Sequence, residues 1–265
     1  METVDHDGRT TAYRYVPGDR DGPAVLYVHG SGATHQLWAQ QYATDGPAHP
    51  AAALDLSGHG ASDDVDTQSG TETLAAYVDD VVAVAEATDA AVLVGNSLGG
   101  AVALETVIER DLSLQGLVLP GSGAKLTVHE DLRVNLAEDF GAAVEFLHRD
   151  DLLFHDPPAY VREGSIETMH AVGQAVTRRD FETCHRFDVR DRLGDIDAPT
   201  LALCGEHDPL TPPSYHEYLA AEIPAGAFET ITGGAHLAMV ERPSAFNDAV
   251  ERFLDQLPDG EARSQ

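Results

Sequence analysis

Hydrophobic positions along the chain fall into two alternating patterns. Short continuous apolar runs indicate buried strands, whereas longer segments with apolar residues every three or four positions indicate helices packed on one face. The alternation predicts a mostly parallel sheet with helices on its faces. The predicted strands lie at 10–16, 24–29, 51–55, 91–95, 115–119, 199–204 and 228–231.

Helices are predicted between these strands. Ser69, with Glu72 three residues later, resembles a reciprocal cap at the start of the first long helix. Further helices are expected over 101–109, after Pro212-Pro213 and over 243–257.

The pattern changes between 121 and 196, where helical spacing continues without strands. We therefore expect one α/β core domain, formed by 1–120 and 197–265, with a helical cap of 121–196 inserted into it.

The charge of the chain is extreme, because 45 acidic residues face 16 basic ones and the formal net charge is −29. Such a field disfavours nucleic acid and anionic membranes as partners. The acidic residues are dispersed and Lys125 is the single lysine, a composition that favours a salt-adapted, halophilic protein whose self-repulsion is screened by salt.

Composition also limits the location and the cofactors. No apolar run approaches the roughly 18 residues that would predict a membrane span. The acidic N-terminus lacks the features of a secretory signal, so a cytoplasmic protein is expected. Cys184 and Cys204 cannot build a disulfide framework or a metal cluster. We expect no metal and no cofactor, and either a monomer or a homodimer.

The strongest chemical signal is the pentapeptide from Gly95 to Gly99, a G-x-S-x-G pattern between a predicted strand and a predicted helix. A direct turn from strand to helix strains the backbone of the central residue and exposes its side chain, and flanking glycines avoid clashes with neighbouring backbone. Ser97 is therefore the predicted nucleophile.

A serine nucleophile needs a base and a group that orients the base. His236 follows a predicted strand and precedes a helix, and is preferred over His29, His59 and His207. Asp208 directly follows the strand 199–204 and is the predicted orienting carboxylate, with Glu206 as its near competitor.

The negative charge that develops on the substrate oxygen requires two N–H donors. The N–H of Leu98, just after the nucleophile, is the first predicted donor. The N–H of Ser31, in the glycine-bearing loop after the strand 24–29, is the second, with Gly32 as the alternative.

These motifs together resemble the α/β-hydrolase superfamily, in the group with a short helical cap, along nearly all of the chain outside the cap. The resemblance rests on His29-Gly30, on Asp55 to Ser62, on Gly95 to Gly100, on Gly205 to Pro212 and on Gly234 to His236 followed by Glu241-Arg-Pro243. In that family the second block usually has arginine where this chain has Ser57, a difference that affects loop anchoring rather than chemistry.

The resemblance implies hydrolysis of carboxylic esters of small to medium acyl groups through an acyl-enzyme on Ser97. Lactone, thioester or carbon–carbon bond hydrolysis with the same triad stay open, as does a haloperoxidase side activity. A non-catalytic ligand-binding member of the fold is a further alternative. Residues expected to contact a small-molecule ester are Gly30, Gly32, Trp38, Phe140, Phe154 and Leu237.

Overall fold

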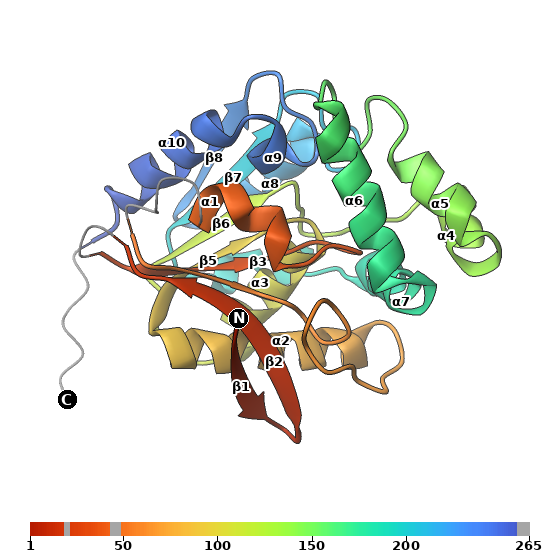
Figure 1. Cartoon of the computed structure of the whole chain (residues 1–265). Coiled ribbons are helices and arrows are strands. Elements are labelled where there is room, and N and C mark those ends of the chain that lie inside the picture. Colours follow the sequence, from red (N-terminus) through yellow and green to blue (C-terminus); the bar gives the residue numbers. More distant parts are fainter. Residues whose placement is uncertain (19–21, 43–48, 259–265) are drawn as a thin grey trace.

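A computed structural model describes residues 1–18, 22–42 and 49–258. They form an eight-stranded sheet in the order β1-β2-β4-β3-β5-β6-β7-β8 (Figure 1). β1 and β2 pair antiparallel with each other, β2 pairs antiparallel with β4, and the other pairs are parallel. The strands are β1 Glu2–His6, β2 Arg9–Val16, β3 Ala24–Val28, β4 Ala51–Leu54, β5 Ala90–Gly95, β6 Gly116–Pro120, β7 Thr200–Gly205 and β8 Gly226–Ile231.

Helices cover both faces of this sheet, which confirms the predicted mostly parallel α/β architecture (Figure 1). On one face lie α2 (Thr71–Thr88), α3 (Leu98–Glu109) and α8 (Pro213–Glu222), which pack on the core cluster that includes Leu93. The opposite face carries the 3₁₀ helix η1 (His35–Trp38), α1 (Ala39–Tyr42), α9 (Ala238–Glu241) and α10 (Pro243–Leu254), which pack on the cluster that includes Val92 and Val94. Because successive side chains of a strand point to opposite faces of the sheet, each central strand contributes apolar side chains to both layers.

Between β6 and β7 the chain contains only helices and loops, apart from an isolated bridge between Lys125 and Asp188. These helices are α4 (Glu130–Glu138), α5 (Phe140–Leu147), α6 (Ala159–Val172) and α7 (Gln174–Arg186), followed by the 3₁₀ helix η2 (Arg190–Asp195). They gather at one end of the sheet in Figure 1. This is the segment 121–196 that the sequence predicts as a cap, and its role as a cap remains a prediction.

Two local features differ from the sequence expectations. The strand β1 was not predicted, although Asp7-Gly8 supplies the two positive-φ residues of a tight hairpin turn between β1 and β2. The expected cap at Ser69 is wrong: α2 follows Gly70, which gives no side-chain cap, and the Glu72 carboxylate accepts the N–H of Gln68.

The described residues contain no helix whose length and apolar character would let it cross a membrane.

Candidate active site

The order of the central strands creates a crevice at the carboxyl edge of the sheet. β3 lies between β4 and β5, so the chain leaves β3 and β5 toward opposite faces. Such a switch point is where ligands bind in open α/β sheets. Val28 pairs with Gly95, so the loop that contains Ser31 lies beside the turn that contains Ser97.

Ser97 occupies that turn in a strained conformation. Its φ of 55° and ψ of −113° are rare for a residue with a side chain. A Cβ on Gly95 would lie 2.2 Å from the carbonyl oxygen of Gly99, and a Cβ on Gly99 would lie 2.3 Å from that of Val28. Glycine at both positions is therefore what allows the chain to turn from β5 into α3 within two residues.

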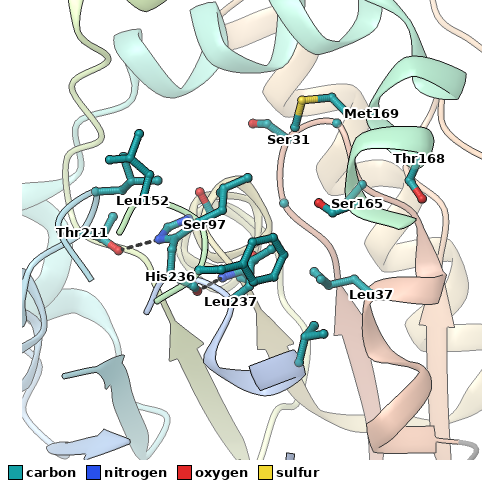
Figure 2. Close-up of a pocket in the computed structure, with 18 of the residues that line it drawn as sticks. Ser31, Leu37, Ser97, Leu152, Ser165, Thr168, Met169, Thr211, His236 and Leu237 are labelled. Carbon is teal, nitrogen blue, oxygen red and sulfur yellow. Dashed lines mark hydrogen bonds between the residues drawn. The ribbon is translucent and has the colours of Figure 1, made fainter. Parts of the chain in front are cut away.

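His236 and Asp208 come together although 28 residues separate them. His236 Nδ1 lies 2.9 Å from Asp208 Oδ2. Because a carboxylate can only accept, Nδ1 carries the proton and Nε2 has the lone pair of a base. His236 and Ser97 line the same cavity, where Figure 2 shows the two side chains next to each other.

Thr211 holds the Asp208 carboxylate in place, a role that the sequence pattern did not predict. Its hydroxyl donates to Asp208 Oδ2 at 2.7 Å and lies 3.2 Å from His236 Nδ1 (Figure 2). Its backbone N–H and that of Leu210 donate to Asp208 Oδ1. Burial would raise the pKa of Asp208, but His236 and these hydrogen bonds lower it below its usual value.

The competing residues have other partners. His29 is fully buried, accepts the N–H of Leu56 through Nε2, and has its pKa lowered by burial to about 4. The ring of His207 stacks on that of His155, with centroids 3.9 Å apart. Glu206 accepts the N–H of Gly233.

A second buried cluster lies behind the loop that contains Ser31. Asp180 of α7 is fully buried and accepts from the Gly32 N–H at 3.2 Å, from His59 Nε2 at 2.9 Å and from the Tyr77 hydroxyl at 2.6 Å. The Gly32 N–H thus has a partner within the protein. The sequence pattern does not predict a role for Asp180, because nothing local distinguishes it from the other acidic residues of α7 and its loops.

Ser57, the position where the sequence departs from the resembled family, is anchored by a buried carboxylate. Its N–H and hydroxyl both donate to buried Asp80, at 2.8 and 2.9 Å. Arg9 donates to the same carboxylate at 3.0 Å. Arg179 of α7 also donates to the Ser57 carbonyl oxygen, at 3.2 Å, so arginines from β2 and α7 both help to fix this loop.

A cavity of about 580 Å³ opens above Ser97, between the sheet edge and the segment 121–196. Four residues expected to contact substrate line it: Gly30, Gly32, Phe154 and Leu237. So do Leu152, Leu153 and Met169. None of the described lining residues is Asp, Glu, Lys or Arg. In the described part of the chain, no three His, Cys, Asp or Glu side chains gather as metal ligands would.

Two of the expected contact residues lie outside the cavity lining. Trp38 is fully buried and packs against Tyr27 and Phe246, with ring centroids 5.0 and 6.1 Å away. Phe140 packs edge-on against His170 at 5.6 Å. Both aromatic side chains fill apolar layers between elements, and sequence patterns do not separate that role from pocket lining.

Known proteins with similar sequences include a lactonase and esterases. A 3-oxoadipate enol-lactonase of Acinetobacter baylyi is 24% identical, with 96% of each chain covered. A pimeloyl-[acyl-carrier protein] methyl ester esterase of Neisseria meningitidis is 28% identical over 88% of this chain and 78% of that protein. The solved structure of a thermophilic esterase is 30% identical, has a TM-score of 0.83 and covers 96% of this chain and 97% of that one.

The family model described as "Alpha/beta hydrolase family" matches residues 25–249, a range that begins in β3 and ends in α10 and so includes the whole crevice described above. With that match over most of its length, the chain belongs to the α/β hydrolase family.

Proposed function

We propose that this protein is a serine hydrolase that cleaves carboxylic esters of small to medium acyl groups through an acyl-enzyme on Ser97. The observation that carries the proposal is a positive-φ serine at a strand-to-helix turn, in a cavity shared with a histidine that donates to a buried aspartate. The esterases among its relatives support the same reaction.

In the proposed reaction His236 Nε2 takes the proton of the Ser97 hydroxyl as the oxygen attacks the ester carbonyl carbon. His236 then gives the proton to the departing alcohol, and Asp208 stabilises the imidazolium in between. Water, activated by the same imidazole, attacks the acyl-enzyme and releases the acid.

The tetrahedral intermediate would be stabilised by the N–H groups of Leu98 and Ser31. Leu98 is the first residue of α3, so its N–H belongs to the free helix end, where the dipole favours negative charge. The Gly32 N–H is held by Asp180, which favours Ser31 as the second donor.

The size and lining of the cavity limit the class of substrate. The cavity volume of about 580 Å³ suits a small ligand, since small-molecule pockets commonly measure about 300 to 1,000 Å³. Because none of the described lining residues is Asp, Glu, Lys or Arg, a substrate carboxylate would lose its hydration without finding a cation to pair with. Uncharged esters are therefore the proposed substrates.

The lactonase relative favours a second reaction with the same machinery. A lactone is a cyclic ester, so attack by Ser97 would open the ring and keep the alcohol attached to the acyl-enzyme. The similarity to the Acinetobacter enol-lactonase is the observation that favours this candidate.

Hydrolysis of p-nitrophenyl butyrate tests the proposal. The assay belongs in about 2–4 M KCl, because the acidic composition predicts a protein that needs charge screening. The Ser97→Ala variant should lose about 10⁴-fold or more in kcat. Ser244→Ala, an exposed serine on α10, is the matched control and should keep wild-type activity. Equal rates for wild type and Ser97→Ala would remove Ser97 from its role.

A further inference from the structure

The wall of the cavity contributed by α6 carries two hydroxyl groups. Ser165 and Thr168 are three residues apart on α6, which places them on one face of the helix, and both line the cavity. Figure 2 shows the Ser165 side chain on the far side of the cavity, pointing toward the side where Ser97 and His236 lie. Their neighbours in the lining, Val161 and Met169, are apolar.

The hydrogen of the Ser165 hydroxyl is committed to His148. His148 Nδ1 lies 2.8 Å from the carbonyl oxygen of Val144, which can only accept, so Nδ1 carries a proton. His148 is buried, and burial lowers its pKa, so the ring is neutral and Nε2 has a lone pair. Ser165 Oγ lies 2.9 Å from that Nε2 and therefore donates to it.

The hydrogen of the Thr168 hydroxyl is committed as well. Thr168 Oγ1 lies 2.8 Å from the carbonyl oxygen of Gly164, and this bond requires Thr168 to be the donor. A hydroxyl has one hydrogen, so both groups can offer only oxygen lone pairs to a ligand. A hydroxyl can both donate and accept, but these local hydrogen bonds leave Ser165 and Thr168 only as acceptors toward a ligand.

We propose that Ser165 and Thr168 form a subsite for an uncharged hydrogen-bond donor, a hydroxyl or an N–H, carried by the ester away from its reacting carbonyl. This inference rests on the proposed esterase function and names the substrate class of that site. A donor on the substrate satisfies the two acceptors. A methyl group in its place covers the two oxygens without offering them a hydrogen, and a site built to bind a hydroxyl rejects the analogue without one.

The test compares esters that differ only by hydroxyl against methyl. One pair varies the acyl side: p-nitrophenyl 3-hydroxybutyrate and p-nitrophenyl 3-methylbutyrate. The other pair varies the alcohol side: 2-hydroxyethyl butyrate and propyl butyrate. A purely apolar wall would favour the methyl member of each pair. The subsite predicts that kcat/KM of the hydroxyl member exceeds that of the methyl member about tenfold in one of the pairs.

Variants then connect the preference to α6. Ser165→Ala and Thr168→Val should each lower the hydroxyl-to-methyl ratio toward one or below it, whereas Thr168→Ser, which keeps the hydroxyl, should retain it. Ser244→Ala should leave the ratio at the wild-type value. The ratio is taken within each variant, so a general loss of active protein cancels.

The outcomes separate the two hypotheses. Preference for the methyl member in both pairs, or a hydroxyl preference that survives Ser165→Ala together with Thr168→Val, would overturn the subsite while the esterase proposal stands. No hydrolysis of p-nitrophenyl butyrate by the wild type would instead remove the proposed function, and the subsite with it.

Discussion

Two buried histidine–aspartate pairs in this molecule have the same short contact but different surroundings. His236 Nδ1 and Asp208 Oδ2 are 2.9 Å apart, and so are His59 Nε2 and Asp180 Oδ2. The second nitrogen of His59 lies 3.2 Å from the Ser57 carbonyl oxygen, so both of its nitrogens face acceptors. His236, by contrast, reaches the cavity that it shares with Ser97.

The comparison shows what makes an imidazole a candidate base. Both nitrogens of His59 face acceptors, an arrangement that favours the charged form, and the side chains of the pair have no exposed surface. Through this pair, Asp180 connects α7 to His59 in the loop after β4 and to Gly32 in the loop after β3. An imidazole can accept a proton in catalysis only if one nitrogen keeps its lone pair next to the nucleophile. A buried histidine–aspartate pair therefore does not by itself identify a catalytic base. What identifies one is access of the second imidazole nitrogen to the cavity and the nucleophile.

The largest expected effect comes from the pair that faces the cavity. Asp208→Asn should lower kcat for p-nitrophenyl butyrate about 10⁴-fold, because the amide favours the wrong tautomer of His236. The matched substitution in the sealed pair, Asp180→Asn, should lower kcat far less, by about tenfold. Equal losses of activity in the two variants would contradict the distinction between a catalytic and a structural pair.

A second prediction concerns stability and the loop that contains Ser31. Asp180→Asn should lower the free energy of unfolding by about 3 kcal/mol, since it leaves a buried imidazolium without its counter-charge. Its loss of activity should appear in kcat more than in KM, because the Gly32 N–H is held next to the proposed oxyanion donor.

Asp80→Asn is the control for this prediction. Asp80 is equally buried, and it accepts from Arg9 of β2 and from Ser57 of the loop after β4, whereas Asp180 accepts from the loop that contains Ser31. It should lose stability with little change in kcat per folded molecule. A kcat loss in Asp80→Asn as large as in Asp180→Asn would show that general loosening, not the Gly32 contact, lowers activity.

The smallest expected effect is a dependence on pH. Burial would lower the pKa of His59, but Asp180 raises it above 6.5 overall. Its folded state therefore binds the proton more tightly than the unfolded state. The stabilisation is complete below about pH 6.5 and is lost as pH rises through the folded pKa. The difference in unfolding free energy between wild type and Asp180→Asn should shrink as pH rises above about 6.5.

Urea unfolding at constant high salt measures this difference. His216 offers a contrast of opposite sign, because burial lowers its pKa to about 4, so its neutral form is favoured and stability falls as pH drops from about 6.5 toward 4. His216→Gln should weaken that acid dependence without changing the alkaline one. A difference between wild type and Asp180→Asn that grows with pH would contradict the charged pair.

Local sequence was enough for every strand except β1 and for the turn at Ser97. Apolar runs of five or six residues, as in β3, β5 and β7, can only be satisfied by burial on both faces, so their pattern predicts the sheet. Gly95 and Gly99 mark a turn too tight for side chains. Asp208 and His236 were predicted from their place after strands, since the carboxyl ends of parallel strands meet at one edge.

Other features depend on contacts that local sequence does not encode. Asp180 is one of 45 acidic residues, and only the packing of α7 against the loop after β3 makes it a buried acceptor. Whether Trp38 or Phe154 lines the cavity depends on which helix covers which layer. The donor or acceptor character of Ser165 depends on a histidine 17 residues away. Sequence determined which residues can do chemistry, while the tertiary structure decided which lone pairs and hydrogens are left to do it.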